Sequence, residues 1–202
     1  MSLHLTEEEY NALQAKRRNE RATAKPRAEG SFASMRNNAD GQRLEGRIQA
    51  ACGYYRDQGR AYVEKIPEPF RTTHTYRDGT FTGRFIANAQ PDFMGILADG
   101  RGICFEAKHT GADRINQSVV TKTQWETLEN FSRAGASSGV CVGFQDMEAF
   151  IPWPVWRNMK ELYGRKYMTR EEAEQYRIQY YNGYALFLDY EHKNEQKELE
   201  GR

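Results

Sequence analysis

A glutamate and a lysine stand two residues apart, at positions 106 and 108, directly after the short apolar run Ile103-Cys104-Phe105. The run predicts a buried β-strand, because it is brief, apolar and followed by polar residues. Successive side chains of a strand alternate between its two faces, so residues two apart share a face. Glu106 and Lys108 are therefore expected side by side on one face of a sheet.

An aspartate completes a candidate cluster with these two residues. Asp92 lies near the start of the preceding apolar segment, and the sequence ADGRG at 98–102 predicts the turn between the two strands. Two carboxylates form an oxygen site suited to Mg²⁺ or Mn²⁺. Lys108 beside them can orient a metal-bound water. Phosphodiester-cleaving enzymes of the PD-(D/E)xK type are built in this way.

A less specific interpretation of the triplet is an ion pair on the surface of an edge strand. Such pairs contribute roughly 0–1 kcal/mol and occur by chance in charged chains. The apolar run before Glu106 argues against this alternative, since charges taken out of water need a partner or a metal.

Residues 41–58 predict a helix, with Asn38 or Asp40 as its N-cap and Gly59 at its end. Its expected buried stripe consists of residues at helical spacing: Leu44, Ile48, Ala51 or Cys52, and Tyr55. Glu45 lies one residue from that stripe, at the edge of the buried face, where a carboxylate can point at the metal cluster. The alternative is an ion pair of Glu45 with Arg43 or Arg47.

A second helix is expected to begin at Thr121 or Thr123 and to bury Trp125, Leu128 and Phe131 or Ser132. Gln124 lies near its start. An amide at this place can donate a hydrogen bond to a phosphate or hold the attacking water. The alternative is an ordinary glutamine on the helix surface.

Several ordered motifs extend the pattern beyond the triplet. They are LE at 44–45, YY at 54–55, K-x-P at 65–67, D-F-x-G at 92–95, FEAK-x-T at 105–110, and Gln124. From about Asn38 to Phe144 the chain thereby resembles the RecU family of Holliday-junction resolvases, which are PD-(D/E)xK nucleases of Gram-positive bacteria and their phages. Two departures, His109 in place of an acidic residue and the KIPEPF wording at 65–70, favour a phage or prophage member.

The resemblance implies an α/β fold in which helices flank a mixed central sheet, restriction-endonuclease-like, with a protruding β-hairpin stalk. It implies an endonuclease that makes paired symmetric nicks in four-way junctions and leaves 5′-phosphate and 3′-hydroxyl ends. It places Glu45, Asp92, Glu106, Lys108 and Gln124 in the active site. The expected Mg²⁺ ligands are Asp92, Glu106, the Ala107 carbonyl and Glu45, with Mn²⁺ as a substitute metal.

Residues 71–86 alternate polar with β-branched or aromatic residues around Asp78-Gly79, a strong hairpin signal. The low apolar content predicts that this hairpin protrudes, and in the resemblance it matches the stalk that enters the open centre of a junction. Its basic residues suit phosphate contact, as do two arginines nearer the N-terminus. The candidate DNA contacts are Arg36, Arg43, Arg71, His74, Arg77 and Arg84. The alternative is an ordinary solvated hairpin.

Length and charge set the expected organisation of the 202 residues. We expect a basic flexible arm at 1–38, a nuclease domain at 39–190 with its stalk at 70–87, and a charged tail at 191–202. The net charge of +1 does not indicate a nucleic-acid binder, but residues 16–47 hold nine Lys or Arg against four acids. This arm either neutralises phosphates or only solubilises the chain.

The cysteines and the hydropathy of the sequence indicate the cellular compartment in which the protein is expected. Cys52, Cys104 and Cys141 are odd in number, lie in apolar runs and lack the spacing of a zinc site. No stretch has membrane-spanning length and no signal-peptide pattern opens the sequence. These features predict a cytoplasmic protein, either bacterial or phage-encoded.

The remaining segments predict further elements of an α/β fold. Residues 139–144 and 149–151 predict partner strands, and Pro152 and Pro154 open a helical region. Residues 169–184 predict one charged, aromatic helix with a Thr169–Glu172 capping box. Residues 185–190 predict a last strand, and 110–121 a polar connection.

A four-way junction has two-fold symmetry, so a homodimer is the expected assembly, with a recombinase as a further partner. Two rival functions stay open. One is another PD-(D/E)xK nuclease, of restriction type or trimming flaps and single strands. The other is a non-catalytic DNA-binding modulator of recombination on the same scaffold.

Overall fold

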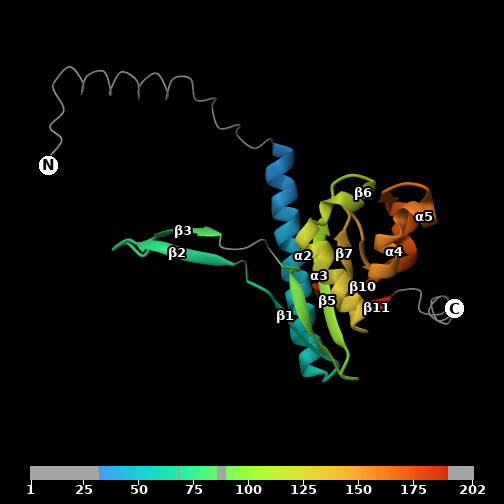
Figure 1. The fold of residues 1–202 in the computed structure, drawn as a ribbon, viewed down its shortest axis with the longest axis horizontal. Coiled ribbons are helices and arrows are strands. Elements are labelled where there is room, and N and C mark those ends of the chain that lie inside the picture. Colours follow the sequence, from blue (N-terminus) through green and yellow to red (C-terminus); the bar gives the residue numbers. More distant parts are fainter. Residues whose placement is uncertain (1–31, 68, 86–89, 191–202) are drawn as a thin grey trace, which may run out of the picture. The chain divides into compact units, whose positions relative to one another are not determined.

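A computed structural model describes residues 32–67, 69–85 and 90–190 (Figure 1). The chain falls into two units, Met1–Arg36 and Asn37–Arg202, and the second holds the sheet and the helices around it. Most of the predicted basic arm and the predicted tail at 191–202 lie outside the described residues. The expected division into arm, nuclease domain and tail therefore stays a prediction.

A five-stranded mixed sheet forms the centre of the second unit, in the order β1-β4-β5-β7-β8. All neighbours are antiparallel except β5 and β7, which are parallel. Its strands are β1 (Ala61–Lys65), β4 (Phe93–Leu97), β5 (Gly102–His109), β7 (Ser137–Gly143) and β8 (Glu148–Pro152). The predicted mixed α/β sheet is confirmed, including the strands expected at 139–144 and 149–151.

Two hydrophobic clusters cover the two faces of the sheet. One is built on α2 (Phe32–Asp57) and contains Phe105, while the other contains Cys104 together with α3 (Lys122–Arg133) and α4 (Trp153–Arg157). Adjacent residues of β5 thus face opposite layers, as the strand period requires. Glu106 and Lys108 stand two and four residues after Cys104, so their side chains point to the same face of the sheet, the one that α3 covers.

The parallel pairing of β5 with β7 needs a crossover, because two parallel strands cannot be joined by a tight turn. The crossover runs through β6 (Arg114–Asn116), the 3₁₀ turn η1 (Gln117–Val119) and α3. The segment expected to be only a polar connection therefore contains a short strand, which pairs with β9 (Tyr167–Thr169). The crossover brings the start of α3 to β5.

Helix α2 begins at Phe32, earlier than predicted, so Asn38 and Asp40 lie inside it and are not caps. No proline or glycine separates Phe32 from Gly41, and the helix continues through this stretch because nothing breaks it. Asp40 instead accepts a hydrogen bond from Arg43 at 3.1 Å. The predicted buried stripe is confirmed, and the helix ends before Gly59, whose φ is +63°.

The single helix predicted at 169–184 is wrong. Short turns α6 (Arg170–Ala173) and η2 (Glu174–Tyr176) lead into a hairpin of β10 (Ile178–Tyr181) and β11 (Tyr184–Tyr190). Asn182 and Gly183 both have positive φ, which is the requirement of a two-residue hairpin turn. The aromatic run before them suits a strand. The Thr169–Glu172 capping box is confirmed.

A separate two-stranded sheet holds the hairpin predicted around Asp78-Gly79. Its strands are β2 (Phe70–Thr75) and β3 (Phe81–Phe85), and every residue of β2 is exposed. Arg71 lies directly opposite Arg84. The remaining helix is α5 (Met159–Tyr163), and none of the described helices has the length and apolarity to cross a bilayer.

A buried carboxylate attaches the last strand to the first helix and first central strand. Asp189 on β11 accepts hydrogen bonds from the Tyr55 hydroxyl at 3.0 Å and from both terminal nitrogens of Arg60 at 2.8 Å. The Tyr55 hydroxyl also accepts the Leu188 N–H at 3.1 Å. This network links segments more than 120 residues apart in the chain.

We predict that Tyr55→Phe lowers the free energy of unfolding by about 1–3 kcal/mol, because it leaves a buried N–H and a carboxylate each short of one partner. The measurement is urea denaturation followed by circular dichroism. Tyr181→Phe is the matched control, since Tyr181 is exposed and its loss should cost less than about 0.5 kcal/mol. Equal losses in the two variants would contradict the proposed importance of the network.

Candidate active site

The register of β4 and β5 brings the predicted carboxylates together. Phe93 pairs with Phe105 in this antiparallel hairpin, so Asp92 lies one step further along, opposite Glu106. The turn between the strands contains Gly100 at φ +86°, a conformation that glycine adopts without strain. The predicted turn therefore sets the register that makes the cluster.

Asp92 and Glu106 are joined through backbone groups. The Asp92 N–H donates to Glu106 Oε2 at 3.2 Å, and the Ala107 N–H donates to Asp92 Oδ2 at 3.0 Å. Each carboxylate is thus held by a backbone N–H of the other strand. The Ala107 carbonyl stays a predicted metal ligand.

Two further side chains meet at the other oxygen of Glu106. Lys108 Nζ is hydrogen-bonded to Glu106 Oε1, and Gln124 Nε2 donates to the same oxygen at 2.7 Å. The side-chain oxygen of Gln124 accepts from the N–H and the hydroxyl of Thr121, each at 3.0 Å. The capping box at the start of α3 thereby orients the amide, with its NH₂ toward the carboxylate. Gln124 is only 4% exposed and is not a surface glutamine.

Burial dominates the electrostatics of the cluster. Glu106 is 1% exposed, and its desolvation, with the nearby charge of Asp92, raises its pKa to about 7 against the opposing effect of Lys108. Burial is also the main cause that raises the pKa of Asp92, and the charge of Glu45 adds to this effect. The hydrogen bond from the Ala107 N–H and the charge of Lys108 act in the opposite direction. Carboxylates whose pKa values burial and a neighbouring charge raise together are a common mark of a functional site.

Glu45 flanks this cluster from α2. Its Oε2 accepts from Lys65 Nζ at 2.5 Å, so its partner is neither of the expected arginines. Arg43 bonds Asp40, and Arg47 pairs with Glu148. Among the residues described, no three Asp, Glu, His or Cys side chains are close enough to form a compact metal site. Glu45 acts on the site through its charge, which raises the pKa of Asp92.

The candidate DNA contacts lie on other surfaces. Arg71, His74, Arg77 and Arg84 are exposed on the β2–β3 hairpin, and Arg43 is exposed on α2. Arg36 lies within α2. Two residues that sequence reasoning missed, Lys65 and Thr121, support Glu45 and Gln124 respectively. The T-x-x-Q spacing of a capping box was the available signal for Thr121.

The carboxylates, lysine and glutamine meet on a mixed α/β sheet in the arrangement that was predicted for the PD-(D/E)xK class. The family model described as RecU, Recombination protein U, matches residues 39–196. Since this match covers more than half of the sequence, the chain belongs to the RecU family of Holliday-junction resolvases, and the predicted resemblance is confirmed.

Comparison with solved structures identifies similar chains, among them Hjc, a Holliday junction resolvase from the archaeal hyperthermophile Archaeoglobus fulgidus. The identity is 14%, the TM-score is 0.34, and the match covers 57% of this chain and 75% of the Hjc chain. Among the curated proteins compared, none matches this sequence. The assignment rests on the family match.

The raised pKa of Glu106 predicts a pH dependence of stability. The ordinary pKa of 4.5 applies in the unfolded chain, so between about pH 4.5 and 7 the folded state binds more protons. The free energy of unfolding of the metal-free protein should therefore fall as pH rises through this window. Urea denaturation in a chelator at pH 5, 6 and 7 measures the slope.

Glu106→Gln is the control for this dependence, because it removes the titrating group while keeping the side-chain shape. The decline with pH should be shallower in the variant than in the wild type. Identical slopes in the two proteins would show that Glu106 titrates at its ordinary pKa.

Proposed function

We propose that this resolvase is a divalent-metal-dependent endonuclease that acts as a cytoplasmic homodimer and makes two symmetric nicks in a four-way junction. The single observation that carries the proposal is the hydrogen-bonded set around Glu106. The buried Glu106 and the half-buried Asp92, both with raised pKa values, meet there with a lysine and an oriented amide, from β5, the start of β4 and α3.

The donor set fits a hard divalent cation. Asp92 and Glu106 supply oxygen ligands, Glu45 flanks them from α2, and the Ala107 carbonyl adds a neutral oxygen. A cation also offsets the desolvation that raises the pKa of both carboxylates. When bound, Mg²⁺ or Mn²⁺ supplies charge stabilisation at the scissile phosphate and a more acidic water.

Lys108 and Gln124 complete the chemistry from the chain itself. Lys108 is half-buried beside Glu106, where its ammonium group can hold the attacking water and offset the negative charge that develops on the phosphate. The Gln124 amide keeps the Glu106 carboxylate in one orientation, because its own oxygen is fixed by Thr121. Gln124 is a positioning residue in this scheme.

The exposed β2–β3 hairpin supports recognition of branched DNA. Arg71 and Arg84 lie directly opposite each other, although like charges across a strand pair are unfavourable unless an anion lies nearby. His74 and Arg77 are exposed on the same hairpin. Contacts of this kind position the DNA backbone and read its shape, not its base sequence.

We predict that Asp92→Asn and Lys108→Ala each lower junction cleavage by at least about a hundredfold, because each removes a group that stabilises the transition state. Junction binding should survive within about threefold. The assay incubates a labelled synthetic four-way junction with purified protein, with and without Mg²⁺, and maps the nicks on all four strands. Binding is measured by fluorescence anisotropy.

The rival functions give different results in the same assay. Faster cutting of linear duplex or flaps than of junctions would indicate another PD-(D/E)xK nuclease. Junction binding without cleavage in Mg²⁺ or Mn²⁺ would indicate a non-catalytic modulator. Equal loss of binding and cleavage in the variants would indicate that they misfold.

Metal binding should also be visible without DNA. We predict that Mg²⁺ raises the melting temperature of the wild type, because a ligand that binds only the folded state stabilises it by mass action. In Asp92→Asn the rise should be largely lost, since one carboxylate ligand is gone. Differential scanning calorimetry with a magnesium titration measures both, and an undiminished rise in the variant would contradict the proposed ligand set.

A further inference from the structure

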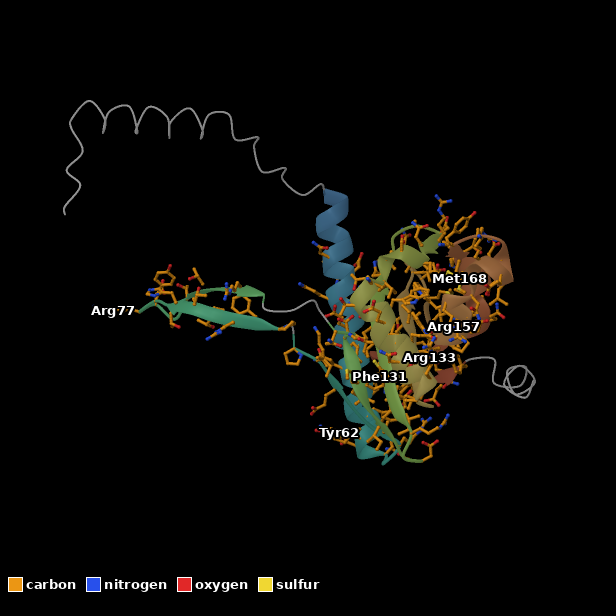
Figure 2. All side chains as sticks on the ribbon, in the orientation of Figure 1. Tyr62, Arg77, Phe131, Arg133, Arg157 and Met168 are labelled. Carbon is orange, nitrogen blue, oxygen red and sulfur yellow. The ribbon has the colours of Figure 1, made fainter. Side chains whose placement is uncertain are left out.

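The small sheet of β6 and β9 packs on the α3 side of the central sheet. Ile115 of β6 pairs with Met168 of β9, which Figure 2 labels, and both side chains are buried in the hydrophobic cluster on that side. Neighbouring residues of a strand point to the opposite face. Arg114, Asn116 and Tyr167 therefore lie on the outer face of the small sheet, away from the core.

An aromatic ring on this outer face holds the side chain of Arg114. The guanidinium carbon of Arg114 lies over the Tyr167 ring, 4.9 Å from the centroid. That of Arg165 lies 4.6 Å from the same centroid. A cation over a ring is attracted by the ring's electrons and donates no hydrogen bond to a lone pair. The contact therefore orients Arg114 and leaves its N–H donors available.

The two guanidiniums over Tyr167 differ in their partners. Arg165 donates to both carboxylate oxygens of Glu172, each at 2.8 Å, and to the Tyr163 carbonyl at 2.9 Å. Within the described part of the chain, the side chain of Arg114 forms no ion pair and no hydrogen bond. Two like charges that share one ring repel each other, and a carboxylate offsets only one of them. The outer face thus lacks an anion beside Arg114.

The other charges near the small sheet do not supply this anion. Asp113 precedes Arg114, but its charge acts on Arg170, whose pKa is raised mainly by the hydrogen bond to Asp146, with Asp113 adding to the effect. The Arg170 N–H also donates to the Asp113 carbonyl at 2.9 Å. Lys166 is exposed beside β9 and has no ion pair with any residue whose position is described. Positive charge therefore predominates on the outer face.

Arg114 belongs to the chain segment whose two ends meet at Glu106. Lys108 before it and Gln124 after it both bond the same oxygen of Glu106. The Thr110 hydroxyl donates to the Arg114 carbonyl at 3.3 Å and ties β6 to the end of β5. Arg114 follows Lys108 by six residues, so their Cα atoms are at most about 20 Å apart. A duplex strand that rises about 3.4 Å per nucleotide covers this distance in about six nucleotides.

We propose that the outer face of the β6–β9 sheet is a second DNA-contact surface, on which Arg114 binds a backbone phosphate of the junction arm beside the cut. The inference rests on the proposed function, because it takes Glu106 as the place of cleavage. A phosphate accepts two N–H groups of the guanidinium and offsets its repulsion with Arg165. DNA is favoured over an acidic protein because the cut strand must pass within reach of Arg114.

This contact selects a position on the strand and reads no base. A phosphate held at a fixed distance from Glu106 determines which neighbouring phosphate lies at the catalytic cluster. Arg114 is therefore a positioning residue, and Lys166 adds positive charge to the same surface. The β2–β3 hairpin, by contrast, is proposed to enter the open centre of the junction.

The first test removes the charge of the phosphate and the guanidinium in turn. Neutral methylphosphonate linkages replace single phosphates within about six nucleotides of the cut in a synthetic junction. Binding is measured by fluorescence anisotropy in a chelator. One or two of these linkages should weaken binding by the wild type about tenfold. In Arg114→Ala the same linkages should have no further effect, because their partner is already absent.

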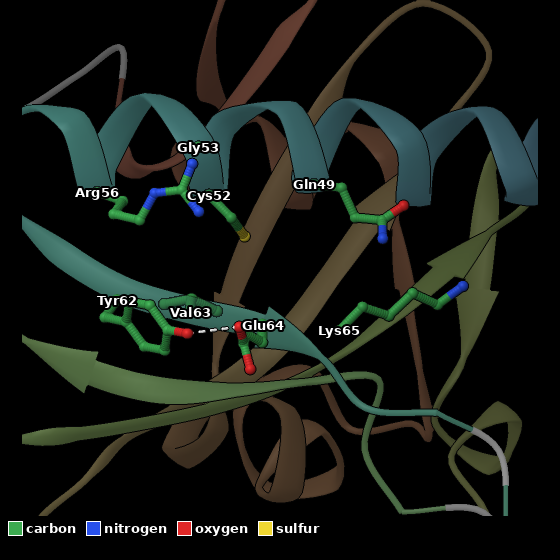
Figure 3. Close-up of a pocket in the computed structure, with 8 residues that line it drawn as sticks. All are labelled: Gln49, Cys52, Gly53, Arg56, Tyr62, Val63, Glu64 and Lys65. Atoms are coloured by element: carbon green, nitrogen blue, oxygen red, sulfur yellow. Dashed lines mark hydrogen bonds between the residues drawn. The ribbon is translucent and has the colours of Figure 1, made fainter.

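Arg56→Ala is the matched control. Figure 3 shows Arg56 in a groove of about 420 Å³ between α2 and β1, on the other side of the central sheet. This variant also loses an exposed arginine, yet it should keep the affinity and the sensitivity to the same linkages. The slope of log Kd against log salt should become shallower by about 0.9 in Arg114→Ala alone. Arg114→Lys should restore this slope but only part of the affinity, because lysine lacks the planar donors.

The second test maps the nicks in Mg²⁺. In Arg114→Ala the nicks should spread to phosphates next to the wild-type position, while Arg56→Ala should keep that position. Tyr167→Leu should spread them to a smaller extent, because Arg114 keeps its charge but loses the ring that orients it. Melting temperatures within a few degrees of the wild type would show that the variants are folded.

The outcomes distinguish this surface from the proposed function. Arg114→Ala with wild-type salt dependence and wild-type sensitivity to every linkage overturns the β6–β9 surface, while metal-dependent cutting of junctions can still hold. A wild type that neither binds nor cuts junctions overturns both. Loss of sensitivity at the same linkages in Arg114→Ala, with a displaced cut and an unchanged Arg56→Ala, supports the surface.

Discussion

Burial of the Glu106 carboxylate is the energetic difficulty around which this fold is arranged. A carboxylate that is 1% exposed must be given partners, or it takes up a proton. Glu106 receives the N–H of Asp92 from β4, the ammonium of Lys108 from its own strand and the amide of Gln124 from α3. Three elements must therefore be in place before the group can be tolerated. In the proposed function, the cost that remains favours binding of a cation.

The sheet topology supplies these partners through two different connections. The tight turn at Gly100 fixes the register of β4 with β5 and so sets Asp92 against Glu106. The parallel pairing of β5 with β7 demands a long crossover, which carries the start of α3 back over the face that holds Glu106 and Lys108. The local connection brings Asp92 to Glu106, and the long one brings Gln124, whose amide bonds the Glu106 carboxylate.

Sequence periodicity predicted the elements that carry their own signal. The apolar run before Glu106 and the stripe at Leu44 and Ile48 each reveal a buried face within one segment. The prediction was wrong where a segment suits two structures. The aromatic stretch before Asn182 was read as helix, yet it forms a strand because the Asn-Gly pair turns the chain back on itself. Glu45 was expected at the metal cluster, with an ion pair to Arg43 or Arg47 as the alternative, and its ion-pair partner is instead Lys65 of β1.

The amino-acid sequence alone determined that Glu106 and Lys108 share one face of the sheet, because side chains alternate along a strand. It also determined the family, through motifs whose order survives without coordinates. Only the tertiary structure decided which oxygen each donor reaches and how deeply the carboxylate is buried. It also decided that, among the described residues, β1 is an edge strand that pairs with β4 alone. These properties depend on the register of strands and on a crossover between distant segments, and no local pattern encodes the distance between two elements that meet only when the chain has folded.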